Sequence, residues 1–532
     1  MVISINPSQS WQGNDGPWST FTLGIGTPAQ WVQVLISTTG VQPWVILSQG
    51  CTPTDPPTCG KSRGNIFYIN QSSTWQDEGL YELDLELNLG YTGSGDFGCD
   101  TLSLGLLGTG LPNMSHQIIA GIAAKDFYLG SWGISPYPTN LTTLDDPKPS
   151  LMSDLKEKNL ISSLSYGYTA GAQYRLKGVL GSLTLGGYDA SLFTPSSTSF
   201  GFAADTSRDL VVGIKSISMS QSAMPTVDLL PTSILSFIDS TVAQIWLPID
   251  ACHEFERAFG ISYDDGTGLY LVNDTLHDSL VARDASLTFT IATDTTSDEI
   301  VNITLPYASF DLHVSYPIVQ NGSSRYFPIR RAENSTQYTL GRTFLQEAYL
   351  TVDYERSNFS VHQCIFQENV PQDLIPILSA NMTSTTTNSF NNHSSLPAGT
   401  DAGIAIGALF VMLLAVGTWF LLRRRRRRRR ESRTQDVIEA PTPEVGQIAE
   451  LDTPSMPQEL ALSNSLTPEV EGTELRRLHE LYSPPEFTEL SGGSSQVYEL
   501  SGESRRLGRE SNLSGQSRRS KPAELHLQQG YF

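Results

Sequence analysis

Two segments of the chain share a pattern in which an apolar run leads into a short hydroxyl-rich turn, with a tryptophan seven residues after the first residue of the turn. The first turn begins at Ser37 and is followed by Trp44; the second begins at Asp239 and is followed by Trp246. A carboxyl group at such a turn can exchange protons with bound water, as general acid–base chemistry requires. A serine hydroxyl cannot act as a base near neutral or acid pH. The pattern therefore predicts a pair of matching positions, the second of which carries an acid–base group.

These paired turns resemble the active-site signature of the pepsin family of aspartic peptidases. In that family both turns read Asp-Thr/Ser-Gly, whereas this chain has Ser37 in place of the first aspartate. Thr39 and Thr241 replace the two glycines, and their β-branched side chains crowd a place where the family brings backbone close to the carboxylates. Further segments resemble the family in the same order over roughly residues 16–366, namely 18–28, 127–133, 181–189, 338–349 and 352–354.

The resemblance implies a reaction in which two carboxyl groups share one proton and hold a water molecule between them. With Ser37 at the first position, Asp239 lacks the neighbour that would split the two pKa values. Loss of one member of a catalytic unit commonly costs about 10⁴-fold or more in rate. Thr38 and Ser240 keep the hydroxyls with which the family braces its two turns against each other. The resemblance therefore favours a retained fold over a retained reaction.

No other segment supplies an obvious replacement for the missing aspartate. Asp205 and Asp294 begin short motifs that look like the signature in isolation. Neither follows a continuous apolar run or precedes a tryptophan at the right spacing, so both are predicted to lie in ordinary turns. The family also covers its cleft with a hairpin, the flap, that carries a tyrosine. Tyr91, in the segment 89–98, is the candidate for that tyrosine, and an ordinary hairpin tyrosine is the alternative.

The elements that must position these residues are mostly β-strands. Short runs alternate apolar and polar residues, as in 81–89, and period-two alternation is typical of half-buried strands. Helical patterning is scarce, with 250–260 and 150–158 as the best short candidates. We predict a mostly β, bilobed, pepsin-like fold with an N-terminal lobe at 1–200 and a C-terminal lobe at 201–370.

All five cysteines precede residue 400. The resemblance implies a small disulfide loop between Cys51 and Cys59, just after the first turn. Cys252 and Cys364 both lie in the predicted second lobe and form a plausible second pair. Cys99 remains, and a buried thiol is the common fate of a free cysteine. No metal or other cofactor is expected.

The C-terminal third has the composition of a membrane anchor and a tail. Residues 402–422 carry no charge and are long enough to span a bilayer, and eight arginines follow at once, Arg423 to Arg430. We predict a Ser/Thr/Asn-rich stalk at 371–401, a transmembrane helix at 402–422 and a disordered cytoplasmic tail at 423–532 with unknown partners. The arginines also suit anionic lipid headgroups. This order of parts resembles fungal membrane-anchored aspartic-peptidase-like proteins.

An extracellular N-terminal part agrees with ten Asn-x-Ser/Thr sequons before residue 400 and one after it. Residues 1–400 hold 17 Lys+Arg and 37 Asp+Glu, a net charge of −20, which argues against nucleic acid as a partner. The segment after Met1 has neither the basic nor the apolar part of a signal peptide. We therefore expect a missing upstream signal, and a single-pass protein in the plasma membrane.

Three functions remain open from the sequence. The leading hypothesis is a catalytically impaired aspartic-peptidase-like protein whose cleft binds a peptide or a cell-wall ligand. The alternative is a working aspartic-type endopeptidase at the cell surface with an altered site. The third is a scaffold whose cleft binds nothing.

Overall fold

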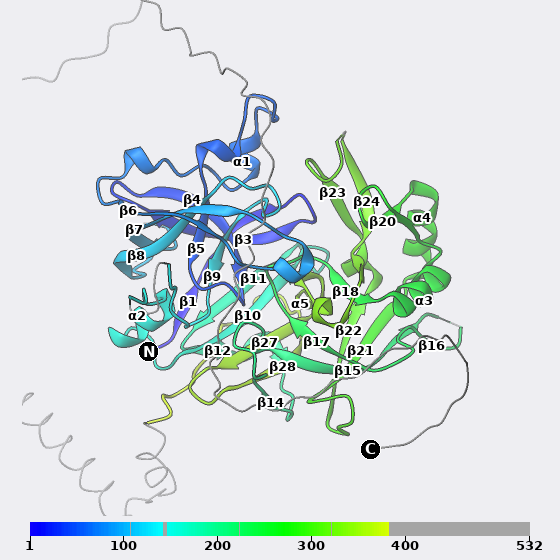
Figure 1. The fold of residues 1–532 in the computed structure, drawn as a ribbon. Coiled ribbons are helices and arrows are strands. Elements are labelled where there is room, and N and C mark those ends of the chain that lie inside the picture. Colours follow the sequence, from blue (N-terminus) through cyan, green and yellow to red (C-terminus); the bar gives the residue numbers. More distant parts are fainter. Residues whose placement is uncertain (107, 142–145, 223, 321, 382–532) are drawn as a thin grey trace, which may run out of the picture. The chain divides into compact units, whose positions relative to one another are not determined.

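The computed structural model describes residues 1–106, 108–141, 146–222, 224–320 and 322–381. All of these described residues belong to one compact unit. That unit is built mainly of strands, arranged as two lobes above a shared sheet (Figure 1). The predicted mostly β, bilobed fold is thus confirmed.

The N-terminal lobe contains one eight-stranded sheet. Its strands lie in the spatial order β2 (Pro7–Gln12), β3 (Trp18–Ile25), β4 (Gln30–Ser37), β9 (Gly130–Gly133), β5 (Pro43–Ile46), β8 (Asn113–Ile122), β7 (Ser94–Leu104) and β6 (Gln76–Glu82). Strand β4 runs parallel to β9, with Ser37 opposite Gly133, and β5 runs antiparallel to β9. The first turn therefore begins at the end of β4, and the chain re-enters the sheet as β5, on the other side of β9.

The C-terminal lobe repeats this arrangement. Its larger sheet has the order β22 (Ile300–Pro306), β21 (Ser286–Ala292), β15 (Val211–Ser220), β17 (Ile234–Ile238), β26 (Thr339–Leu340), β18 (Ile245–Pro248) and β25 (Ile329–Ala332), with β16 (Val227–Asp228) on β15. Strand β17 runs parallel to β26, and β18 runs antiparallel to β26. The turn after β17, which begins at Asp239, is thus the counterpart of the turn at the end of β4. A smaller sheet contains β19 (Ser262–Asp264), β20 (Leu269–Val272), β24 (Ser323–Phe327) and β23 (Leu312–Ser315).

A fourth sheet joins the two halves of the chain. It orders β1 (Ile3–Ile5), β11 (Val179–Leu185), β10 (Ser165–Ala172), β27 (Ala348–Asp353), β28 (Asn358–Cys364) and β13 (Phe193–Thr194), with β14 (Phe200–Gly201) on β28. Because β10 pairs with β27, strands that close the first and second lobes are hydrogen-bonded to each other. One continuous apolar core includes residues from all four of these sheets. This shared base fixes the distance between the two turns.

The helices are few and short: α1 (Cys59–Ser62), α2 (Leu151–Glu157), α3 (Ile249–Phe259), α4 (Asp274–Arg283) and α5 (Arg342–Leu345). The predicted helices at 150–158 and 250–260 are confirmed as α2 and α3. The sequence patterns did not predict α4, which begins after Asn273, whose side chain accepts a hydrogen bond from Leu276 N.

The strand predicted at 81–89 is wrong beyond its first residues. Strand β6 ends at Glu82, and a 3₁₀ turn, η3, covers Leu87–Leu89. Asp84 and Glu86 have φ values of 50° and 59°, in the left-handed region. A left-handed residue reverses the strand direction locally, so the alternation of side chains between two faces is lost.

Strand β29 (Leu374–Pro376) pairs with β12 (Gly187–Asp189), so residues within the range predicted as a stalk, 371–401, join a sheet of the folded domain. Within the described ranges, no helix is both long and apolar enough to cross a membrane. The predicted helix at 402–422, the arginines that follow it and the tail at 423–532 lie outside the described residues.

Candidate active site

The two signature turns meet at the centre of the domain and hold each other by reciprocal hydrogen bonds. Thr38 N donates to Ser240 Oγ at 3.0 Å, and Ser240 N donates to Thr38 Oγ1 at 3.0 Å. Ser240 Oγ also donates to the carbonyl oxygen of Ile36 at 2.7 Å. Because Thr38 and Ser240 are buried, these bonds are shielded from competition with water. The turns are therefore rigidly placed with respect to each other, in the manner the sequence resemblance implies.

Ser37 is fully buried and its hydroxyl is engaged on two sides. Ser37 Oγ lies 2.7 Å from Thr241 Oγ1 and accepts a hydrogen bond of 2.7 Å from Gly40 N. Behind this turn the backbone of Gly133 approaches so closely that an added Cβ would lie 2.3 Å from the carbonyl carbon of Gly40. The turn geometry thus persists, with a neutral hydroxyl where the second motif has a carboxyl.

Asp239 is also fully buried, and its two oxygens have different surroundings. Oδ1 accepts hydrogen bonds from Thr39 Oγ1 at 2.8 Å, from Thr241 N at 2.9 Å and from Thr38 Oγ1 at 3.4 Å. Oδ2 is buried and accepts no hydrogen bond from any N–H or hydroxyl of the described residues. Thr39, which stands at a glycine position of the signature, therefore has a specific contact: its hydroxyl crosses between the turns to reach Asp239.

A second carboxyl group approaches Asp239 from a direction that the sequence motifs did not indicate. Glu86 lies between β6 and η3, is only 8 % exposed, and its carboxyl group is close enough to Asp239 to feel its negative charge. Burial raises the pKa of Glu86 well above its usual value, the negative charge of Asp239 raises it further, and Arg208 opposes both effects. The site therefore contains two adjacent carboxyl groups, with Glu86 contributed by the hairpin rather than by the first turn.

The sequence patterns did not indicate Glu86 as a site residue, because alternation over 81–89 assigns it to the polar face of a strand. The one signal that could have indicated it is its position just before Tyr91, the candidate flap tyrosine. Tyr91 itself packs against Phe127, with ring centroids 5.4 Å apart, and borders a cavity between the lobes. The structure thus places Tyr91 beside the cleft.

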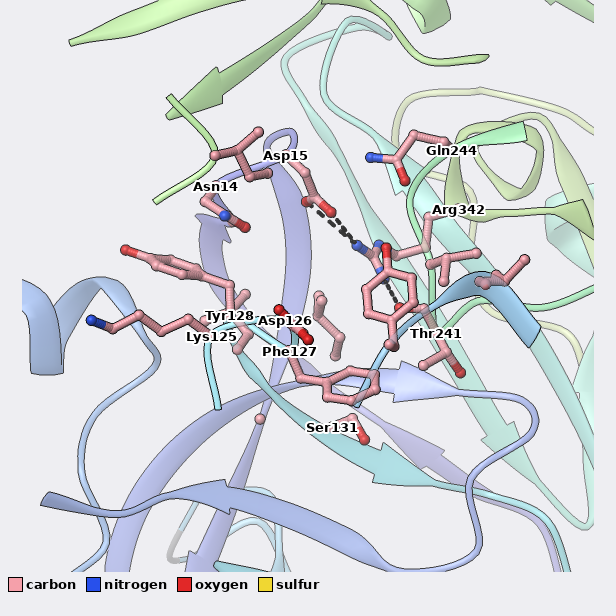
Figure 2. A pocket seen from close by; sticks show the side chains of 18 of the residues that line it. Asn14, Asp15, Lys125, Asp126, Phe127, Tyr128, Ser131, Thr241, Gln244 and Arg342 are labelled. Carbon is pink, nitrogen blue, oxygen red and sulfur yellow. Dashed lines mark hydrogen bonds and ion pairs between the residues drawn. The ribbon is translucent and has the colours of Figure 1, made fainter. Parts of the chain in front are cut away.

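That cavity has a volume of about 490 Å³ and is lined by residues of both lobes (Figure 2). Arg342, one of the lining residues, forms an ion pair with Asp15 at 3.2 Å. Arg342 Nη1 donates to the carbonyl oxygens of Ser240 and Thr241 at 2.9 and 2.7 Å, so a buried guanidinium supports the second turn from below. The cavity offers room for a side chain of a bound peptide next to the paired turns.

The aspartates considered as replacements are turn residues. Asp205 Oδ1 accepts hydrogen bonds from both the amide and the hydroxyl of Ser207, and Asp294 Oδ1 accepts the same pair from Thr296. Such contacts two residues ahead are typical of turns in which the aspartate side chain closes the loop. Within the described ranges, no three His, Cys, Asp or Glu side chains converge as metal ligands would.

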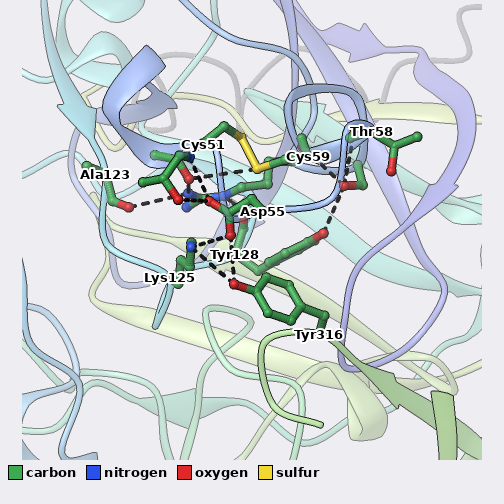
Figure 3. The surroundings of a disulfide bond; sticks show 12 residues. Cys51, Asp55, Thr58, Cys59, Ala123, Lys125, Tyr128 and Tyr316 are labelled. Atoms are coloured by element: carbon green, nitrogen blue, oxygen red, sulfur yellow. Dashed lines mark hydrogen bonds and ion pairs between the residues drawn. A yellow bond between two sulfur atoms is a disulfide. The ribbon is translucent and has the colours of Figure 1, made fainter. Parts of the chain in front are cut away.

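The disulfide between Cys51 and Cys59 is confirmed (Figure 3). The predicted pair Cys252–Cys364 is wrong, because both are buried free thiols. Cys252 lies in α3 with its thiol near the carbonyl oxygens of Leu247 and Arg330, whereas Cys364 ends β28 in another sheet, with its thiol near the Thr169 hydroxyl. Cys252 and Cys364 both fall in the segment predicted as the second lobe, but the fold places them in different parts of the structure. Cys99, whose state the sequence left open, is a buried free thiol.

The disulfide loop also contacts the opposite lobe. Asp55, inside the loop, accepts a hydrogen bond of 2.7 Å from the hydroxyl of Tyr316 and pairs with Lys125 at 2.5 Å (Figure 3). The pairing with Lys125 is the main cause of a lowered pKa for Asp55. A charged hydrogen bond thus joins the lobes at the edge of the cleft.

Comparison with known proteins agrees with this geometry. The family model described as eukaryotic aspartyl protease matches residues 20–364. The chain belongs to that family. It is 22 % identical over 369 residues to aspartic proteinase 3 of Saccharomyces cerevisiae, covering 65 % of this chain and 59 % of that protein. It is 24 % identical over 285 residues to secreted aspartic protease 7 of Candida albicans, covering 53 % of this chain and 44 % of that protein. The matched regions therefore span about half the length of these curated relatives.

Proposed function

We propose that this aspartyl-protease-family protein binds a peptide or a peptide-like cell-wall ligand in its cleft and is impaired in the hydrolysis that two aspartates would carry out. The observation that carries the proposal is the buried hydroxyl of Ser37, bonded to Thr241 at 2.7 Å in the place of the first carboxyl.

The oxygens of the two turns differ in the proton transfers that they can support. Hydrolysis needs one group to take a proton from water and another to donate a proton to the scissile carbonyl. Ser37 Oγ, whose partners are Thr241 and Gly40, offers no charge change near neutral or acid pH. Asp239 then lacks a rigidly held partner on the opposite turn, and a rate loss of about 10⁴-fold or more is expected.

Binding, in contrast, depends on parts that the chain retains. The braced turns, the hairpin over the cleft and the cavity of about 490 Å³ all support a site that receives an extended peptide. Arg342 holds the carbonyl groups of the second turn in place, which favours a preformed site.

A working endopeptidase is the second candidate, and the contact between Glu86 and Asp239 favours it because two carboxyl groups do adjoin. Glu86 sits on the hairpin, however, and any movement that admits a peptide moves it away from Asp239. We therefore rank binding above hydrolysis. Substitution of Glu86 by Gln would abolish turnover under this second candidate.

We also propose that the domain is presented outside the cell on a membrane anchor. The support is compositional: the uncharged segment 402–422, the adjoining Arg423 to Arg430 and the bias of sequons to the first 400 residues. Protease protection of the two ends in intact cells tests this part of the proposal, which predicts a shielded C-terminal tail and an accessible N-terminal domain.

Ligand binding is tested by titrating the purified full-length chain with a statine-type peptide inhibitor at about pH 7 in a calorimeter. We expect saturable binding without cleavage. The Ile318→Trp variant places a large ring in the cavity and should weaken binding at least about tenfold. The matched control, Ile300→Trp, alters an exposed residue of β22 and should bind normally. If the folded parent chain does not bind the inhibitor, the proposed binding function is wrong and the scaffold hypothesis remains.

A further inference from the structure

A hydrogen bond between the neighbouring carboxyl groups of Glu86 and Asp239 can form only when a proton lies between them. Both side chains are buried, Asp239 completely and Glu86 to 8 % exposure. Two ionised carboxylates offer only acceptors, whereas a protonated carboxyl can donate to its ionised neighbour. Asp239 Oδ2 is the oxygen that no N–H or hydroxyl of the described residues reaches. A single shared proton would satisfy it.

The hairpin that carries Glu86 is docked on the C-terminal lobe at two further points. Asn88 Nδ2 donates to the carbonyl oxygen of Thr336 at 2.6 Å, and Gln337 Nε2 donates to the carbonyl oxygen of Asn88 at 2.6 Å. Leu89 is buried in a small apolar cluster with Val242, Trp246 and Ala332. The hairpin is therefore closed over the second turn, with Glu86 at the point of contact.

Few charged or titratable groups face this pair. Arg208, from the segment before β15, feels the charge of both carboxyl groups and favours the ionised form of Glu86. Tyr91 feels the charge of Glu86, and Tyr166 and Tyr168 of β10 feel the charge of Asp239. Arg342 contacts the carbonyl groups of Ser240 and Thr241, next to Asp239. The tyrosines remain neutral over the relevant pH range, so Arg208 is the main charged group that favours loss of the proton from Glu86.

We propose that a proton shared between Glu86 and Asp239 locks the hairpin over the cleft, and that loss of this proton on raising the pH releases the hairpin and admits the ligand. The inference rests on the proposed binding function. Burial raises the pKa of Glu86, so the protonated, closed state is favoured at acid pH. Above that pKa two buried carboxylates repel each other and the closed state loses its central contact. The cleft of this chain is thus gated by pH.

Hydrogen–deuterium exchange of the ligand-free full-length chain tests the gate directly. The reporters are the amides of Leu89 and Tyr91, which both donate to the carbonyl oxygen of Glu86, at 3.0 and 3.2 Å. After correction for intrinsic exchange, their protection should fall roughly tenfold or more between about pH 4 and pH 8. Protection that does not change with pH would overturn the proposal.

Two variants should move the gate in opposite directions. In Glu86→Gln the amide can donate to ionised Asp239 without a shared proton, so the hairpin should stay protected at both pH values. In Glu86→Ala the contact is absent, and protection should be low at both. General damage to the hairpin would lower protection in both variants and would contradict the gate. Glu82→Gln, an exposed position on β6, is the matched control and should behave as the parent chain.

The same samples separate the gate from the binding function. If hairpin protection falls with pH but no peptide binds, the gate stands and the proposed function fails. If a statine-type peptide binds equally at both pH values while protection stays constant, the function stands and the gate fails.

Discussion

His362 predicts a defined loss of stability in acid. The imidazole lies on β28 with 6 % exposure, and its ring stacks on that of Phe193 with centroids 4.3 Å apart. Nδ1 accepts a hydrogen bond of 2.9 Å from Ser196 N, so this nitrogen carries no proton in the folded state. A proton added at Nδ1 would displace that hydrogen bond and place a charge in a buried site.

The magnitude follows from the pKa values of the folded and unfolded states. Burial lowers the pKa of His362 to about 4, from 6.5 in the unfolded chain. As the pH falls, the unfolded state takes up the proton first, so the contribution to stability is complete above pH 6.5 and is lost progressively towards about pH 4. The difference corresponds to about 3 kcal/mol of unfolding free energy.

Urea unfolding followed by tryptophan fluorescence measures this loss, with one titration at each of several pH values between about 4 and 7. His362→Gln is the informative variant, because the amide oxygen can still accept from Ser196 N but does not titrate. It should flatten the pH dependence by about 2–3 kcal/mol over this range. His253→Gln, at an exposed position of α3, is the control and should leave the slope unchanged.

An unchanged slope in His362→Gln would refute the reasoning, because it would mean that His362 has the same proton affinity in the folded and unfolded chain. A flatter slope in His253→Gln of equal size would refute it as well, because burial would then not be the cause.

Two further predictions concern hydrogen bonds, one that Tyr316 makes between the lobes and a set that Arg63 makes within the N-terminal lobe. The Tyr316→Phe variant removes the hydroxyl that donates to Asp55 from the opposite lobe. It should lower the unfolding free energy, measured in urea at neutral pH, by about 1–2 kcal/mol. A change below about 0.3 kcal/mol would show that this hydrogen bond does not stabilise the protein. Arg63 is fully buried and donates hydrogen bonds to the carbonyl oxygens of Gly50, Ala123, Ala124, Phe127 and Tyr128. The Arg63→Lys variant has too few donors for all five carbonyl groups, so it should lower the unfolding free energy by about 2–4 kcal/mol. The loss should be seen as a lower Tm, and an unaltered Tm would contradict this expectation.

The fold was predictable because its signals are local and ordered along the chain. The two turns, each between an apolar strand and a tryptophan, indicated the repeated strand arrangement that places Ser37 and Asp239. Short polar–apolar patterns also predicted α2 and α3. These features depend on residues close together in sequence, and the tertiary structure leaves them unchanged.

The contact of Glu86 was not predictable from the same signals. Alternation over 81–89 assumes an extended chain, but left-handed residues at Asp84 and Glu86 turn the hairpin, so that Leu87 is 56 % exposed and Glu86 is buried. What favours this conformation is contact with the other lobe, through Asn88 and Leu89. Periodicity contains no information about such a partner.

The predicted pairing of Cys252 with Cys364 was wrong for a related reason. Position in the sequence indicated that Cys252 and Cys364 share the second half of the chain, but β28 belongs to the sheet that joins the lobes, whereas α3 packs beside β18 and β25. The short loop between Cys51 and Cys59 leaves little choice of partner, and that pairing was predicted correctly.

Ser37 in place of the first aspartate is proposed to impair hydrolysis. The most direct test is a peptide-hydrolysis assay of the purified full-length chain between about pH 3 and pH 8, beside Asp239→Asn. We predict that the parent chain shows no turnover above that of Asp239→Asn and that a statine-type inhibitor changes neither. Turnover in the parent chain that the inhibitor blocks and that Asp239→Asn abolishes would contradict the claim and establish a working peptidase.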